Sequence, residues 1–195
     1  MLMCRSAIER KRMSHVAKIK KLLATEDEQI INTAILLLRS LEEASMADVF
    51  KPLSYVEGTI FPPKAFRKHA STYIDLLAQY SKYDEEIASF CASITKLSMA
   101  KFGTDSELAP FVNLKKLIIY QVEEGVDLTV LSRVKTLEEL ELVRVLEGED
   151  IRFVKGLQKL RALTITSWSN LESIEALHNH PTLVSLRIVA CPKLH

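Results

Sequence analysis

Apolar positions recur at a fixed interval in the second half of the chain. Segments with apolar residues at their first, fourth and sixth positions begin at Leu114, Leu137, Leu160 and Leu183, and the spacing between successive segments does not change. A related segment begins at Ile94, slightly less than one interval before Leu114. A constant period of this length predicts structural units that repeat along the chain and stack on their neighbours.

The stretches between these segments keep the same phase, and their apolar residues are spaced by three. The corresponding triplets are Leu128, Leu131 and Val134, then Ile151, Val154 and Leu157, then Ile174, Leu177 and His180. Spacing by three is helical, so each unit is predicted to be a short strand followed by a short outer helix or 3₁₀ segment. One unit cannot bury its apolar side alone, and stacking supplies a common core.

The repeat resembles the LxxLxLxxN/CxL pattern of the leucine-rich repeat family over roughly the second half of the chain. The resemblance implies an α/β solenoid of about five short parallel strands with outer short helices, over residues 93–195. The family's asparagine or cysteine position falls on Val122, Val145, Trp168 and Cys191, of which only Cys191 conforms. We therefore expect the turns to be held by packing instead of by a polar side chain.

Residues 1–92 differ in character, because their apolar positions follow a helical period. A stripe over residues 8–23, a capping box from Thr25 to Glu28 and an apolar face over residues 30–41 predict a helix pair loosely similar to a HEAT hairpin. Pro62 and Pro63 suit the start of a third helix that reaches Tyr80, and a fourth spans residues 84–92. Solenoids need their open ends covered, so we expect this region to be a helical N-terminal cap.

Composition narrows the class of protein without naming a partner. The chain has 195 residues, a net charge of +1, 48% apolar and 26% charged residues, as in ordinary globular domains. Cys4, Cys91 and Cys191 have no metal-binding or disulfide spacing, which favours a reducing compartment. No apolar run is long enough to span a bilayer, and the start lacks the apolar stretch of a secretory signal. We expect a cytoplasmic protein without a transmembrane segment.

Catalytic and metal-binding patterns are sparse. GxSxG, HExxH, GxxxxGK[ST] and GxGxxG are all missing, and five glycines leave little material for a phosphate-binding loop. His178 and His180 flank Asn179, but His180 occupies a repeat position held elsewhere by Val134 or Leu157, which predicts a partly buried side chain. We expect neither enzymatic activity nor a cofactor or metal ion.

The resemblance places partner binding on the concave face, which carries the residues between the strand leucines. Ile118, Tyr120 and Val143 are apolar there without a structural need. Five strands about 4.8 Å apart form a trough roughly 20 Å long, which suits a peptide or one helix. We predict a non-catalytic module that binds a protein or peptide. The candidate site is Lys116, Ile118, Tyr120, Glu139, Glu141, Val143, Arg144, Thr164 and Arg187.

Two other surfaces remain open as alternatives. The first predicted helix is basic and could bind nucleic acid or an anionic membrane surface, through Arg5, Arg10, Arg12, Lys18, Lys20 and Lys21. The last strand, residues 183–190, could pair with a second copy, although Pro192 and the charges of Arg187 and Lys193 are common ways of protecting such an edge.

Overall fold

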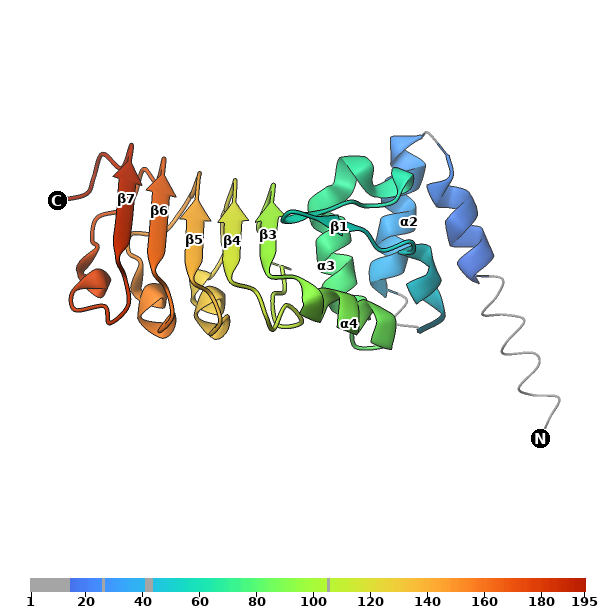
Figure 1. Ribbon diagram of the computed structural model, residues 1–195. Coiled ribbons are helices and arrows are strands. Elements are labelled where there is room, and N and C mark those ends of the chain that lie inside the picture. Colours follow the sequence, from blue (N-terminus) through green and yellow to red (C-terminus); the bar gives the residue numbers. More distant parts are fainter. Residues whose placement is uncertain (1–14, 26, 41–43, 105) are drawn as a thin grey trace.

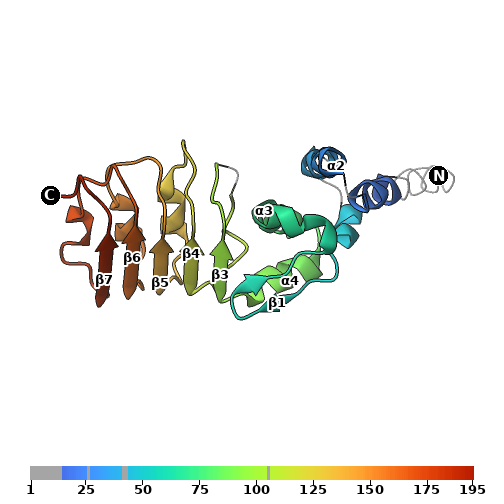
Figure 2. The same cartoon turned by 90° about the horizontal axis from the view of Figure 1, so that it is seen from above.

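The computed structural model describes residues 15–25, 27–40, 44–104 and 106–195 (Figure 1). Helices make up most of its N-terminal half, and a parallel sheet makes up its C-terminal half (Figure 1). Seen from above, the short helical segments that connect the strands all lie on one side of the sheet (Figure 2). The predicted α/β class is confirmed.

The sheet has five parallel strands in the order in which they occur along the chain. They are β3 (Lys96–Met99), β4 (Lys116–Ile119), β5 (Glu139–Leu142), β6 (Ala162–Thr166) and β7 (Ser185–Val189). The register pairs Leu117 with Leu140, Leu140 with Leu163 and Leu163 with Leu186. Residues separated by the constant interval in the sequence are therefore register partners on adjacent strands.

Three connections contain 3₁₀ segments, η3 (Leu128–Arg133), η4 (Arg152–Gly156) and η5 (Glu175–Leu177). A polar side chain precedes each one and accepts a hydrogen bond from the backbone N–H two residues further on. The acceptors are Asp127 at 2.9 Å, Asp150 at 2.8 Å and Ser173 at 3.2 Å. These residues follow the same interval as the strands, so the same side-chain-to-backbone bond repeats with them.

A second buried row lies beside the strand leucines, at the turn that follows each strand. Phe102, Val122, Val145 and Trp168 are bridged to one another in parallel register, and all four are buried. The indole N–H of Trp168 donates to the carbonyl oxygen of Gly148 at 2.8 Å. Large apolar side chains thus fill the space between neighbouring turns. Polar side chains contribute as well, since the N–H of Gly125 donates to Glu147 at 2.8 Å.

Side chains also connect one repeat to the previous one. Asn113 donates to the carbonyl oxygen of Ala92, and Thr136 and Thr182 donate to those of Leu114 and Leu160, each over 2.8 Å. These bonds tie the residues that lead into β4, β5 and β7 to the preceding unit.

The N-terminal half contains a helical segment over residues 15–23 and five further helices within the described ranges. They are α2 (Glu28–Ser40), η1 (Ala44–Val49), η2 (Lys64–His69), α3 (Ala70–Tyr80) and α4 (Glu85–Ser93). The third predicted helix is thus divided into η2 and α3, whereas the fourth agrees with α4 within one residue. Leu41, the last residue of the predicted second helix, lies outside the described residues.

The predicted capping box at the start of α2 is wrong. Asp27 accepts hydrogen bonds from the backbone N–H groups of Gln29 at 2.9 Å and Ile30 at 3.2 Å. The hydroxyl of Thr25 instead donates to the carbonyl oxygen of Leu22, at the end of the preceding helix. A carboxylate that can reach two N–H groups is the stronger cap, because a charged acceptor makes stronger bonds than a hydroxyl.

Four aromatic rings form the centre of the helical half. Phe50, Phe66, Tyr73 and Tyr80 are buried, with ring centroids 4.8 Å apart for Phe50 and Tyr80 and 5.1 Å apart for Phe66 and Tyr73. The hydroxyl of Tyr73 donates to the carbonyl oxygen of Phe50 at 2.7 Å, and that of Tyr80 to Leu38 at 2.8 Å. Each buried hydroxyl therefore has a partner, which lets the rings contribute their full apolar area.

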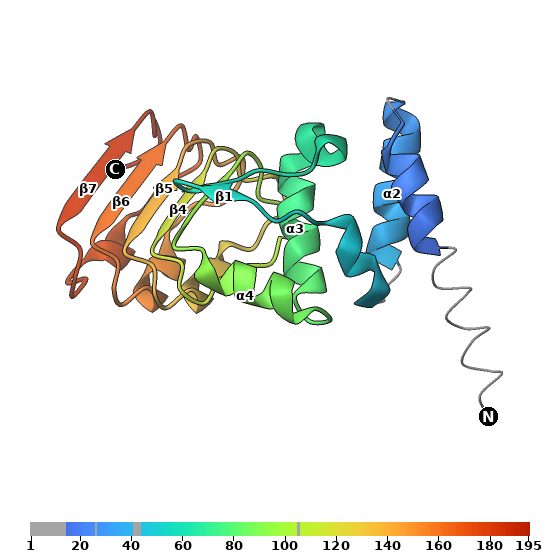
Figure 3. The same ribbon diagram turned by 45° about the vertical axis from the view of Figure 1, so that its right-hand side comes forward.

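A short hairpin covers the first edge of the sheet, and the sequence did not predict it. Its strands are β1 (Tyr55–Val56) and β2 (Thr59–Ile60), and it reaches from the helical half to the sheet (Figure 3). The N–H of Ser98 donates to the carbonyl oxygen of Gly58 at 3.2 Å, and the hydroxyl of Tyr55 donates to that of Lys96 at 2.8 Å. The edge of β3 is thereby satisfied, and no described strand pairs with the outer edge of β7.

Candidate functional site

Alternate residues of the strands point away from the core, onto the side opposite the 3₁₀ segments. We call this surface the open sheet face. Its residues are Lys96, Ser98, Lys116, Ile118, Tyr120, Glu139, Glu141, Val143, Ala162, Thr164, Thr166, Ser185, Arg187 and Val189. In β3 and β4 these residues are half-buried while their strand neighbours are fully buried. A partner could therefore contact these side chains without disturbing the core, which is formed by the alternate residues of the same strands.

An apolar group lies on two adjacent strands of this face. Tyr120, directly after β4, has 53% of its surface exposed, whereas Ile118 and Val143 are half-buried. The N–H of Val143 donates to the carbonyl oxygen of Ile119 at 2.9 Å, so the polypeptide after β5 runs beside β4. The structure thus brings Ile118, Tyr120 and Val143 onto neighbouring positions, as the sequence pattern implies.

The polar residues of the site form rows across the strands. Lys116 and Glu139 are direct partners in the register of β4 and β5, and their side chains form an ion pair. One step along, Ile118 is the partner of Glu141, Glu141 of Thr164, and Thr164 of Arg187. Arg144 lies in the turn after β5 and is exposed. The face therefore carries charges of both signs around a small apolar centre.

The residues with possible catalytic or metal-binding chemistry lie elsewhere than on the open sheet face. No group of three or more His, Cys, Asp or Glu side chains within the described ranges is placed to hold a metal ion. His180 is half-buried, as predicted, and His178 is exposed. Cys91 is fully buried, and burial raises the pKa of its thiol to about 12, so it stays protonated at neutral pH.

The basic region and the last strand are placed as follows. Arg5, Arg10 and Arg12 lie outside the described residues, while Lys18, Lys20 and Lys21 are exposed on the segment over residues 15–23. The exposed large apolar side chains at the last strand are Val184, directly before β7, and Leu186 and Val189 within it. Neither nucleic-acid binding nor self-association is tested by this placement, and both stay predictions. In the part of the chain that is described, no helix has the length and apolarity needed to cross a bilayer.

Known proteins add no family to this picture. No protein-family model matches the chain, and no curated protein is significantly similar to it. The candidate site therefore depends on its own geometry: neighbouring strand positions, most of them half-buried, with an exposed tyrosine, two apolar neighbours and charged residues around them.

Proposed function

We propose that residues 93–195 form a leucine-rich repeat solenoid, that residues 1–92 cap its first edge, and that the open sheet face binds a protein or peptide without catalysis. Support for the solenoid comes from the sequential parallel strands, their constant register and the repeated side-chain-to-backbone bonds of Asp127, Asp150 and Ser173. Support for the cap comes from the hairpin bonds that cover β3.

The exposure of Tyr120 is the observation that carries the binding proposal. Its side chain is 53% exposed beside the half-buried Ile118 and Val143, so covering it would remove apolar area from water that folding leaves exposed. Tyrosine is among the residues that most often dominate interfaces, because a rigid ring offers large contact area and a hydroxyl.

The surrounding charges favour a protein partner over a simple polyanion. Lys116 is already paired with Glu139, and Glu141 lies in the same row as Arg187. A nucleic acid would meet both signs on this face, whereas a peptide or helix can match each charge in turn. A polar periphery around an apolar centre is also the common layout of protein interfaces.

The proposal is tested with immobilised wild-type protein, Tyr120→Ala and a matched control, Val112→Ala, used to capture partners from the source lysate. Val112 is 56% exposed but precedes β4 and is not part of the open sheet face. We expect a protein that wild type and Val112→Ala retain and Tyr120→Ala loses. For that protein, Tyr120→Ala should weaken the affinity by about 1–2 kcal/mol, or roughly 5- to 30-fold. The melting temperature should not change.

A parallel variant separates this function from binding through the basic region. Charge reversal at Arg10 and Arg12 should leave capture intact, and an apolar contact should depend weakly on salt. Capture that is lost in the charge-reversal variant, falls steeply with ionic strength and survives Tyr120→Ala would place the function in the N-terminal region. The cytoplasmic location stays a prediction, which microscopy of a tagged chain checks.

A further inference from the structure

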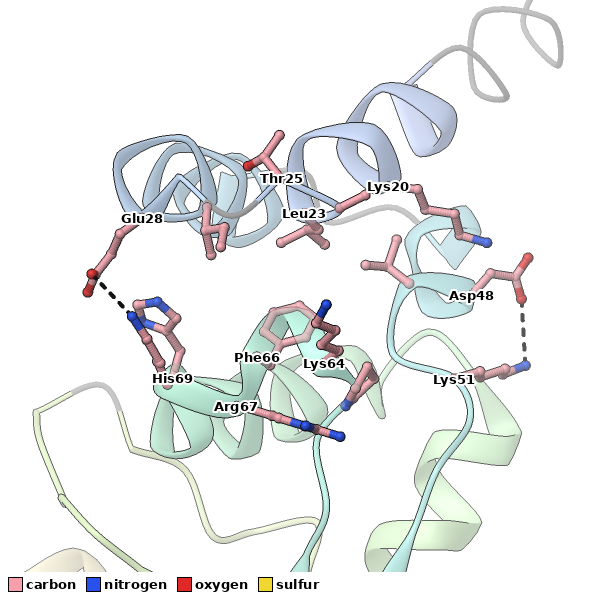
Figure 4. A pocket seen from close by; sticks show the side chains of 15 residues that line it. Lys20, Leu23, Thr25, Glu28, Asp48, Lys51, Lys64, Phe66, Arg67 and His69 are labelled. Atoms are coloured by element: carbon pink, nitrogen blue, oxygen red, sulfur yellow. Dashed lines mark ion pairs between the residues drawn. The ribbon is translucent and has the colours of Figure 1, made fainter.

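A cavity of about 790 Å³ lies in the helical half, far from the open sheet face along the chain. It opens between the helical segment over residues 15–23, α2, η1 and η2 (Figure 4). Leu23 and Phe66 point toward one another from opposite walls (Figure 4). Val49 and the half-buried Ile31 and Pro63 complete an apolar floor. Cavities of this volume are typical of sites for small organic ligands.

The rim of the cavity is strongly cationic. Five lysine or arginine side chains and two carboxylates line it, which gives a formal charge of +3, compared with +1 for the whole chain. The basic residues are Lys20, Lys51, Lys64, Arg67 and Lys68, and the acidic ones are Glu28 and Asp48. Positive charge is therefore concentrated here, although the protein as a whole is nearly neutral.

The two carboxylates leave part of this charge uncompensated. Asp48 lies 3.7 Å from the ammonium of Lys51, and Glu28 lies 3.8 Å from that of Lys68. Lys51 also contacts Glu86 at 2.6 Å, so it is the most fully paired of the group. Within the described ranges, Lys20 and Arg67 have no carboxylate partner, and both side chains are exposed to solvent.

We propose that this cavity binds an amphiphilic anion, a molecule with a carboxylate or phosphate head on an aliphatic chain. The apolar lining residues that stay accessible, Ala24, Ile31 and Pro63, suit the chain, because covering them removes hydrocarbon from water on both sides. The head group lies at the rim, where the cation of Lys20 or that of Arg67 supplies charge-assisted hydrogen bonds. A neutral or cationic analogue has the aliphatic chain but cannot make the charge-assisted hydrogen bonds.

Four probes with the same chain separate the contributions: decanoate, decyl phosphate, decanol and decyltrimethylammonium, titrated calorimetrically below their aggregation limits. We expect one or both anions to bind at least about tenfold more tightly than decanol and the cation, a difference of roughly 1.4 kcal/mol. The tighter of the two anions identifies the head group, a free carboxylate or a phosphate. Equal affinity for anionic, neutral and cationic probes would overturn the proposal, because only an apolar surface would then be needed.

Matched variants locate the site. Lys20→Gln combined with Arg67→Gln should weaken binding of the preferred anion about tenfold, and Lys193→Gln, an exposed lysine outside the cavity, should not change it. Thermal melting should be the same in wild type and both variants, because none of these side chains is buried. Unchanged anion binding in the double variant would overturn the assignment.

Two further arms separate binding in this cavity from binding elsewhere. Binding to phosphatidylglycerol vesicles without binding of free decanoate or decyl phosphate would overturn the proposal in favour of a membrane surface. Tyr120→Ala should bind the anion like wild type, since Tyr120 does not line the cavity. The outcome is therefore independent of whether the open sheet face binds a protein.

Discussion

Leucines at one repeat position, in adjacent strands, differ sharply in burial, and this difference allows a controlled test of the stacked core. Leu163 in β6 is 1% exposed, whereas its register partner Leu186 in β7 is 44% exposed. Substitution by alanine removes the same atoms at both positions, but from a buried site in one case and from a half-exposed site in the other. We expect the free energy of unfolding to fall much more for Leu163→Ala than for Leu186→Ala.

The expected magnitudes follow from the buried area. Leu→Ala removes three carbon atoms, which at about 0.8 kcal/mol per buried methylene amounts to roughly 2.4 kcal/mol for a fully buried side chain. An enclosed cavity adds to this, so Leu163→Ala should cost about 3–5 kcal/mol. Only about half of the Leu186 side chain is buried, so its removal loses about half of that transfer free energy, and it leaves no enclosed cavity. Its substitution should therefore cost roughly 1.3 kcal/mol.

Urea unfolding at about 25 °C, followed by circular dichroism, measures these differences, with Thr164→Ala as the control. Thr164 lies beside Leu163 in β6 but on the open sheet face, so its substitution should change the free energy by less than about 0.5 kcal/mol. Equal losses for Leu163→Ala and Thr164→Ala would refute the assignment of inward and outward positions. Equal losses for Leu163→Ala and Leu186→Ala would show that something covers β7 in solution.

Two further predictions concern titratable groups. Cys91 should react with iodoacetamide only after unfolding, because burial blocks access and raises its pKa to about 12, whereas Cys191 should react in the native protein. Mass spectrometry of native and urea-treated samples checks this. Rapid labelling of Cys91 in the native protein would contradict it. Hydrogen bonds from the hydroxyl and N–H of Thr129 lower the pKa of Asp127 below its ordinary value of 3.8. The ionised Asp127 side chain should therefore stabilise the fold above the pH that equals its ordinary pKa. This stabilisation should be lost as the pH falls through the lower pKa of the folded protein. In Asp127→Asn, the urea midpoint should depend less on pH than in wild type between pH 5 and pH 2 (about the range of an aspartate titration). The same pH dependence in both proteins would argue against the cap.

The repeat half could be predicted closely because its elements depend on local periodicity. From the fourth position on, apolar and polar residues alternate in most segments. A strand is therefore the conformation that buries Leu140 and Leu142 and turns Glu139 and Glu141 to the other side. The constant interval then determines which residues become neighbours, since equal units stack in register. The placement of Ile118, Tyr120 and Val143 on one face follows from the same alternation.

Contacts between residues far apart in the chain were decided by the tertiary structure. Tyr55 and Gly58 lie in a stretch without a clear strand pattern, and they form a hairpin because the unpaired edge of β3 offers them the backbone groups of Lys96 and Ser98. The capping of α2 by Asp27 in place of Thr25 depends on where the previous helix ends, which its periodicity left undetermined within a few residues.

The cationic cavity is the clearest case of a feature that only the tertiary structure creates. Lys20 and Arg67 are ordinary surface residues in the sequence, far apart along the chain, and nothing in their local pattern distinguishes them from other solvated charges. Folding makes both of them part of the lining of one cavity, between the segment over residues 15–23 and η2. Local periodicity thus determined the sheet and its exposed face, because strands depend on neighbours in sequence. The cavity depends on helix packing, which the sequence specifies only through the whole core.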